Sequence, residues 1–178
     1  MSHEPVVAIV GVTGAVGAEF IATMDRRDFR VGKLKALASA RSAGRTIPFR
    51  GREVVIEELD ERSFDGVDIA LFSAGGDTSK ALAPEAASRG ATVIDNSSAW
   101  RMDPDVPLVV SQVNPDDLAW HEGIIANPNC STMQLVPPLM ALRDAVGLER
   151  VVVDTYQAVS GTGGKAIREL QAQVEAYV

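Results

Sequence analysis

The first apolar run of the chain, Val6-Val7-Ala8-Ile9-Val10, passes directly into the glycine-rich segment Gly11-Val12-Thr13-Gly14-Ala15-Val16-Gly17. A continuous apolar run of this length predicts a strand that is buried on both faces, as in a parallel sheet. Helical spacing of apolar residues follows at 20, 21 and 24. Strand, glycine turn and helix are typical of a dinucleotide-binding unit, although the spacing G-x-x-G-x-x-G also fits an ordinary glycine-rich turn.

The three glycines have distinct expected roles. Gly11 permits the tight turn, Gly14 lets the backbone approach a pyrophosphate, and Gly17 lets the helix pack closely on the strand. We therefore expect the backbone at Gly11 and Gly14 to contact the cofactor.

Strands and helices alternate over the first 95 residues. Apolar runs predict strands at 34–38, 67–72 and 91–95, and an alanine-rich segment predicts a helix at 78–89. Weak alternation over 52–59 indicates an edge strand. The fold class is therefore α/β, with a doubly wound parallel (Rossmann-type) sheet.

The end of the second predicted strand indicates which nicotinamide cofactor binds. An NAD-binding unit places Asp or Glu there to hold the ribose 2′-hydroxyl. This chain has Ser39, Arg41 and Ser42 instead, so we expect NADP, although a solvated loop arginine is the simpler alternative. Small residues after the strand at 67–72 allow a ligand to approach closely, and they are Ser73, Ala74 and Gly75.

The only cysteine, Cys130, lies in Asn127-Pro128-Asn129-Cys130-Ser131-Thr132, between a predicted strand at 123–126 and a helical pattern. Ser131 and Thr132 are candidates for the helix cap. A helix N-terminus favours a thiolate, so we interpret Cys130 as a nucleophile, whereas a lone cysteine elsewhere is more often a small buried hydrophobe.

Arg101 follows another predicted strand end and is adjacent to Trp100. It is a candidate for binding a carboxylate or phosphate in bidentate fashion, or else a surface charge packed on the tryptophan.

Composition excludes several classes of partner. Lys plus Arg number 17 against 24 Asp plus Glu, a net charge of −7, so we expect no nucleic-acid partner. One cysteine excludes an internal disulfide and suits a reducing compartment. No apolar run reaches the roughly 18–20 residues that span a bilayer, and the N-terminus lacks a signal-peptide layout. We expect a cytoplasmic protein without a membrane segment or a metal.

Five blocks in this order resemble the aspartate-semialdehyde dehydrogenase family in its bacterial forms: GVTGAVG at 11–17, ASARSAG at 38–44, DNSSAWRMD at 95–103, IANPNCST at 125–132 and TYQAVSG at 155–161. The resemblance implies an NADP-dependent enzyme that interconverts aspartyl-4-phosphate and aspartate semialdehyde in the biosynthesis of lysine, threonine and methionine. It implies a thioester on Cys130, substrate positioning by Gln157 and Asn129, and phosphate binding by Arg101. It also implies NADP contacts from the glycine turn, at Thr13, Gly14, Ala15 and Val16, and from Ser160 and Gly161. Finally, it implies a homodimer as the full-length protein.

Two departures from the family matter. Its catalytic base is a histidine that lies beyond these blocks, and neither His3 nor His121 matches that motif, so we expect this chain alone to be inactive. Family members are about twice as long. The chain is therefore interpreted as an NADP-binding domain over 1–130 and, over 131–178, the beginning of an α+β catalytic and dimerisation domain, to which alternation at 150–159 contributes a strand and 165–178 a helix.

Two alternatives remain open. One is a reductase of N-acetyl-gamma-glutamyl phosphate, which shares the thioester chemistry, although the turn at 127–130 argues against it. The other is a non-catalytic NADP-binding module, which the missing histidine favours.

Overall fold

The computed structural model describes residues 4–177, in which a seven-stranded sheet has the strand order β3-β4-β2-β1-β5-β6-β7. Neighbouring strands are parallel except β3 and β4, which are antiparallel. The strands are β1 (Val6–Val10), β2 (Lys33–Ala38), β3 (Thr46–Phe49), β4 (Arg52–Glu58), β5 (Ile69–Phe72), β6 (Thr92–Asp95) and β7 (Ile124–Ala126). The strand order reverses at β1, as in a doubly wound sheet, and the predicted fold class is confirmed.

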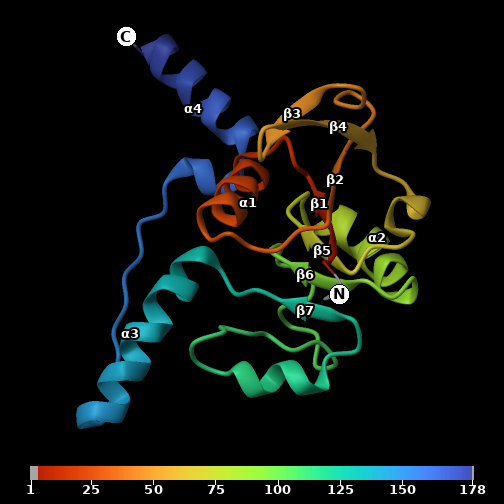
Figure 1. Ribbon diagram of the computed structural model, residues 1–178. Helices are drawn as coiled ribbons and strands as arrows, with labels where there is room; N and C mark the ends of the chain where they lie inside the picture. The colour runs from red at the N-terminus through yellow and green to blue at the C-terminus, as the bar shows by residue number, and fades with distance from the viewer. Residues whose placement is uncertain (1–3, 178) are drawn as a thin grey trace.

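Besides the strands, residues 4–177 contain four α-helices and three 3-10 helices. They are α1 (Ala15–Arg26), α2 (Gly76–Ser88), α3 (Cys130–Val146), α4 (Gly164–Tyr177), η1 (Glu61–Phe64), η2 (Pro115–Trp120) and η3 (Val159–Thr162). In Figure 1, α1 and α2 lie against the sheet, whereas α3 and α4 project away from it.

Both faces of the sheet are buried, which explains the unbroken apolar run of β1. Val7 and Ile9 belong to a core cluster that includes Met24 of α1. Ala8 and Val10 point to the opposite face and belong to a second cluster, formed with α2 and η1. Since successive side chains of a strand alternate between faces, a strand covered on both sides has no position for a polar residue.

At Gly11 and Gly17, a side chain would collide with nearby backbone atoms. Gly11 has φ +86°, and a Cβ atom there would lie 2.5 Å from the carbonyl oxygen of Ser73. A Cβ on Gly17 would lie 2.5 Å from the carbonyl oxygen of Gly11 and 2.7 Å from the Cα of Val12. Gly17 therefore allows the close packing of α1 on β1 that its position predicts.

The predicted edge strand is not at the edge. β4 pairs with β2 on one side and with β3 on the other, so the prediction for residues 52–59 was wrong in this respect. β3 and β4 form a hairpin whose two loop residues, Arg50 and Gly51, have φ +49° and +73°. Arg-Gly is a weaker hairpin signal than Asn-Gly, because arginine rarely adopts positive φ. The Arg50 guanidinium stabilises this turn by donating to the carbonyl oxygens of Met24 and Phe29.

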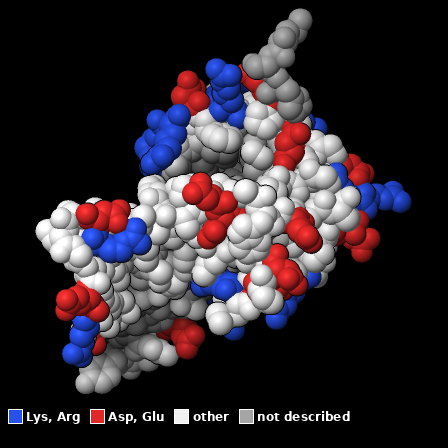
Figure 2. Space-filling view, turned by 90° about the horizontal axis from the view of Figure 1, so that it is seen from below, with Lys and Arg blue, Asp and Glu red and all other residues white. Residues whose placement is uncertain are grey.

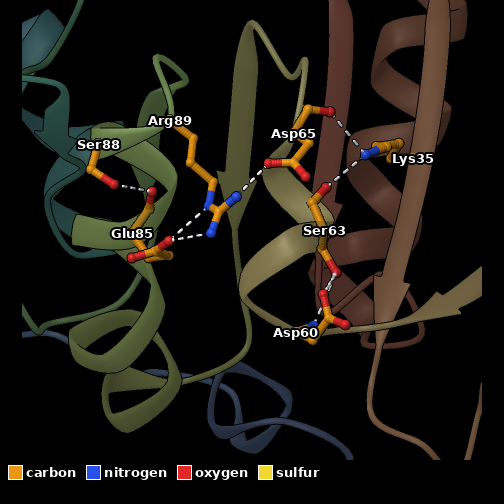
Figure 3. Close-up of polar contacts among 7 residues, drawn as sticks. All are labelled: Lys35, Asp60, Ser63, Asp65, Glu85, Ser88 and Arg89. Atoms are coloured by element: carbon orange, nitrogen blue, oxygen red, sulfur yellow. Dashed lines mark hydrogen bonds and ion pairs between the residues drawn. The ribbon is translucent and has the colours of Figure 1, made fainter.

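A polar network fastens η1 between β2 and α2 (Figure 3). The ammonium group of Lys35 donates to the carbonyl oxygens of Ser63, at 2.8 Å, and Asp65. Arg89, just after α2, pairs with the carboxylates of Asp65 and Glu85. These hydrogen bonds raise the pKa of the Arg89 guanidinium above its ordinary value.

The strand predicted at 150–159 does not form. Residues 147–158 have no regular secondary structure, Tyr156 is 100% exposed, and Val151, Val152 and Val153 are also exposed. A strand needs a neighbour to satisfy its backbone groups, and no neighbouring strand lies beside this segment within residues 4–177. The predicted final helix is present as α4, and Val178 lies outside the described residues.

Charged side chains of both signs lie on the surface, as the composition indicates. The face seen in Figure 2 has acidic and basic side chains interspersed with wide neutral areas. Between residues 4 and 177, no helix is long and apolar enough to cross a membrane.

The close approach of α1 to β1 predicts a large cost for Gly17→Ala. Alanine favours a helix by about 1 kcal/mol over glycine, but here its Cβ would meet backbone atoms, which cannot move aside easily. Overpacking costs roughly 1–3 kcal/mol, and backbone atoms at 2.5–2.7 Å from the new Cβ place this change at the upper end of that range. After subtraction of the helix gain we expect a net loss of about 2 kcal/mol in the free energy of unfolding, measured by urea denaturation.

Gly76→Ala is the matched control, because Gly76 opens α2 and a Cβ there has no atom within 4 Å. It should leave the free energy of unfolding unchanged within about 0.5 kcal/mol. Equal stability of the two variants would contradict the packing role of Gly17.

Candidate active site

The candidate site lies at one edge of the sheet, where all the parallel strands end. The residue after each of these strands is Gly11, Ser39, Leu59, Ser73, Asn96 or Asn127. In an open α/β sheet, ligands bind in the crevice beyond the carboxyl ends of the strands. The topology therefore brings segments from the whole first 130 residues to one edge.

A cleft of about 880 Å³ opens beside the glycine turn. The expected cofactor residues that line it are Gly11, Thr13, Gly14, Ser39, Ser73, Ala74 and Gly75. Gly14 and Gly75 are the N-caps of α1 and α2, and neither helix has a side-chain cap. Two helix N-termini with free backbone N–H groups at one cleft can bind an anion such as a pyrophosphate.

A smaller cleft of about 260 Å³ continues from the first one across Gly14, Ser73 and Gly75. It is lined by Ala15, Val16, Ser160 and Gly161 among the expected residues, and by Asn96, Ser97, Gly163 and Gly164 in addition. The two clefts share walls, so together they can hold an elongated ligand.

Arg41 and Ser42 do not line either cleft. They follow Ser39 in an exposed turn in which the Ser42 amide donates to the Ser39 carbonyl oxygen. Other residues line the larger cleft without having been predicted, among them Glu58, Leu59 and Thr162. The signal that could have found Glu58 and Leu59 is the end of β4, once that strand is recognised as a parallel neighbour of β2.

Cys130 is the first residue of α3, and it is exposed. The cap of this helix is Asn129, whose side-chain oxygen accepts from the Ser131 amide at 2.9 Å, so the expectation of a cap at Ser131 or Thr132 was wrong. Asparagine is as strong a cap as serine, and its place one residue before the cysteine brings Cys130 into the first turn. The sulfur is therefore in the first turn of α3, at the positive end of the helix dipole.

Gln157 comes to the same sulfur from the irregular segment after α3. Its side-chain amide lies 3.2 Å from Cys130 Sγ and donates to it. Gly161 leaves the space for this contact, because a Cβ there would lie 2.5 Å from the Gln157 amide nitrogen. The structure thus brings together two expected site residues that are 27 positions apart.

Arg101 lies against the turn that leads to Cys130. Its Nε donates to the Asn127 carbonyl oxygen at 2.8 Å, and its Nη2 donates to the Asn96 carbonyl oxygen at 3.3 Å. A guanidinium has five N–H donors, and its remaining ones bind no other group within residues 4–177. They are available to bind an anion.

His121 is not part of this site. It lies before β7 and its Nδ1 accepts from the Gly123 amide, whereas Cys130 follows the other end of that strand. Three strand residues at about 3.3 Å each separate the two ends by roughly 10 Å. His3 lies outside the described residues. Within residues 4–177, no cluster of three or more metal-ligating side chains was found.

The doubly wound sheet, the glycine turn and the cleft define a Rossmann-type dinucleotide-binding protein. A family model described as "Semialdehyde dehydrogenase, NAD binding domain" matches residues 6–121, and one described as "Semialdehyde dehydrogenase, dimerisation domain" matches residues 139–177. The chain belongs to the semialdehyde dehydrogenase family.

Individual relatives agree with this membership. An aspartate-semialdehyde dehydrogenase of Bacillus subtilis is 56% identical over 97% of this chain and 50% of its own length. The crystal structure of aspartate semialdehyde dehydrogenase II from Vibrio cholerae, complexed with ASA, is 48% identical, with a TM-score of 0.91 over 97% of this chain and 52% of that one. An enzyme of the same name from Candida albicans, solved with NADP, is 27% identical, with a TM-score of 0.67 over 81% of this chain and 48% of that one. The chain spans about half the length of the curated relatives that it matches.

The contact between Gln157 and Cys130 should depend on the absence of a side chain at Gly161. In Gly161→Ala, the new methyl group pushes the Gln157 amide beyond the hydrogen-bond limit of about 3.5 Å. Only the end of a flexible side chain must move, so stability should change by less than about 1 kcal/mol. The crystal structure of the variant, together with a denaturation curve, measures both effects.

Gly164→Ala is the control from the same cleft wall, because the nearest atom to a Cβ there is the Arg168 Nη1, at an ordinary 3.4 Å. It should leave the 3.2 Å contact intact. If Gln157 kept its contact in the Gly161 variant as well, the spacing argument would be wrong.

Proposed function

We propose that the protein from which this chain comes reduces aspartyl-4-phosphate to aspartate 4-semialdehyde, and catalyses the reverse reaction, through a thioester on Cys130. The observation that carries the proposal is the Gln157 amide at 3.2 Å from a cysteine sulfur at a helix N-terminus, beside a dinucleotide cleft. The names of the Bacillus subtilis and Vibrio cholerae relatives support this substrate class.

Cys130 supplies the nucleophile. Its thiolate attacks the acyl carbon, the bond from that carbon to the phosphate oxygen breaks, and inorganic phosphate leaves with its electron pair. This exchange replaces one difficult step by two easier ones. Gln157 holds the sulfur and the acyl group in place, Asn129 caps the helix that presents the sulfur, and Arg101 binds the phosphate that leaves.

The nicotinamide cofactor fits the residues present. Two uncapped helix N-termini meet at the larger cleft, and glycines there leave room for a ligand beside the backbone. When bound, NADPH supplies the hydride that reduces the thioester. Ser160 and Gly161, which line the smaller cleft, would hold the nicotinamide end.

We propose NADP in preference to NAD, with the 2′-phosphate bound by Ser39, Arg41 and Ser42. The absence of an acid at the end of β2 and the structure of the Candida albicans enzyme with NADP support this preference. Arg41 is exposed in the turn just after Ser39, which lines the cleft, so its side chain can reach a phosphate there.

Arg41→Ala tests the cofactor preference. A hydrogen bond to a charged group contributes about 1.5–3 kcal/mol, so NADP affinity should fall roughly 10- to 100-fold while NAD affinity stays within about twofold. Isothermal titration calorimetry measures both affinities. Arg30→Ala, which removes the same charge beyond the far end of α1, should change neither. Equal weakening for both cofactors in the Arg41 variant would rule out a 2′-phosphate contact.

The proposal extends to domains and assembly. Residues 1–130 form the NADP-binding domain, and residues 131–178 begin the catalytic and dimerisation domain of a homodimer. The family match over 139–177 and the exposed apolar residues of 151–153 and α4 support this division. We also propose that the protein works in the cytoplasm, in amino-acid biosynthesis.

Cys130 should be labelled by iodoacetamide in the folded protein, because its side chain is exposed and it is the only cysteine of this chain. In the protein made from the complete gene, labelling at this site should abolish oxidation of aspartate semialdehyde with NADP and phosphate. Cys130→Ala should lower turnover at least about 10³-fold, as loss of a nucleophile does, without loss of NADP binding. Peptide mapping and cofactor fluorescence measure the two effects. Unchanged turnover after complete labelling would refute the thioester.

A further inference from the structure

The carboxyl group of Asp95, at the end of β6, has no role in the chemistry described above, and its surroundings are unusual. The residue is 0% exposed, and within residues 4–177 its Oδ1 atom has no hydrogen-bond partner. Burying an acceptor without a partner costs folding free energy, so such a group calls for an explanation. An apolar residue of the same size would avoid that cost.

The other oxygen of Asp95 organises the turn that follows. Oδ2 accepts from the Ser97 hydroxyl at 2.6 Å and from the Ser97 amide at 3.2 Å. The Ser97 hydroxyl oxygen in turn accepts from the Ala99 amide at 3.1 Å. An aspartate that accepts from the amide two residues later fixes the local backbone direction. Two of the five residues after β6, Ser97 and Ala99, thus take their places from this carboxyl group, directly or through the Ser97 hydroxyl.

The turn ends at Trp100 and Arg101, and both are tied to neighbouring elements. The Trp100 ring nitrogen donates to the buried hydroxyl of Ser79 in α2 at 2.9 Å. The Arg101 guanidinium donates to the Asn127 carbonyl oxygen, three residues before Cys130. The Asn127 amide donates at 2.8 Å to the carbonyl oxygen of Asp95. Asn127 is thus bonded both to Arg101, at the end of the turn, and to Asp95, at its start.

We propose that Asp95 is a positioning residue for Arg101. Its buried carboxyl group holds the 96–101 turn so that the guanidinium stays against Asn127 and aims its free N–H groups at the phosphate beside Cys130. This inference rests on the proposed role of Arg101 in binding phosphate. Asp95 does not touch the substrate, so its effect passes through Arg101 and falls on phosphate binding.

The test uses the protein made from the complete gene, with inorganic phosphate as the varied substrate of semialdehyde oxidation. Arg101→Ala should raise the KM for phosphate roughly 10- to 100-fold. Asp95→Ala should raise the same KM about 5- to 30-fold, with kcat and the KM for NADP changed less than about threefold. Asp95→Asn should stay within about threefold of the wild type, because its amide oxygen can still accept from Ser97.

A double-mutant cycle separates positioning from general structure. If Asp95 acts through Arg101, the double variant has the same phosphate KM as Arg101→Ala alone. Multiplied effects of the two changes, a loss confined to kcat, or an asparagine variant as poor as the alanine variant would overturn the inference. If Asp95→Ala does not fold, Ser97→Ala replaces it in the cycle, with a smaller rise in phosphate KM that must also vanish in the Arg101→Ala background. An unchanged phosphate KM in Arg101→Ala itself would refute the proposed role of Arg101, which distinguishes that failure from a failure of Asp95.

Discussion

The site depends on a backbone ladder that continues one residue beyond the parallel strands. The amides of Leu59, Gly11, Ser73, Asn96 and Asn127 each donate to a carbonyl oxygen of the neighbouring strand, at 2.8–2.9 Å. These bonds align five loops that come from distant parts of the chain. Because every loop starts at the same level of the sheet, Gly11, Ser73 and Asn96 all line the two adjoining clefts.

Close packing then fixes what the loops present. Gly17 lets α1 approach the backbone of Gly11 and Val12, and Gly11 lets the glycine turn approach the backbone of Ser73, because a Cβ atom would have no room at either position. The uncapped start of α1 thus faces the cleft. α2 likewise begins without a side-chain cap, at Gly75, whose φ is +90°. α3 differs, since Asn129 caps it and its first residue is the cysteine. Two helix N-termini are thus open for an anionic cofactor, and the third presents a sulfur.

The sequence alone predicts the elements whose structure follows from their own residues. The apolar runs of β1, β2, β5 and β6 are buried on both faces, so their composition alone identifies them. The β3–β4 hairpin was missed because its turn, Arg50-Gly51, gains its stability from contacts of the arginine with Met24 and Phe29, which are far along the chain. The strand expected at 150–159 was predicted from alternation, but alternation states which face can be buried and does not supply a partner strand.

The residues of the candidate site likewise divide into those whose position could be predicted from the sequence and those whose position could not. Cys130 and the glycines could be predicted because a strand, a turn and a helix in succession place them without reference to the rest of the fold. Glu58 and Leu59 could not, since they reach the cleft only through the pairing of β4 with β2. Asp95 could not be singled out for another reason: it ends an apolar run, where an acid is ordinarily a solvated strand terminus, and its complete burial is evident only in the structure.

Gln157 lies within hydrogen-bond distance of Cys130 although it belongs to an irregular segment. Residues 147–158 lack a strand ladder, so no sheet holds the glutamine in place. The next turn does so instead, because η3 closes through the Gly161 amide bonded to the Ala158 carbonyl oxygen and the Gly163 amide bonded to that of Ser160. The same turn lines the smaller cleft. Gly161 therefore belongs both to the wall of the smaller cleft and to the surroundings of the Gln157 amide that donates to Cys130.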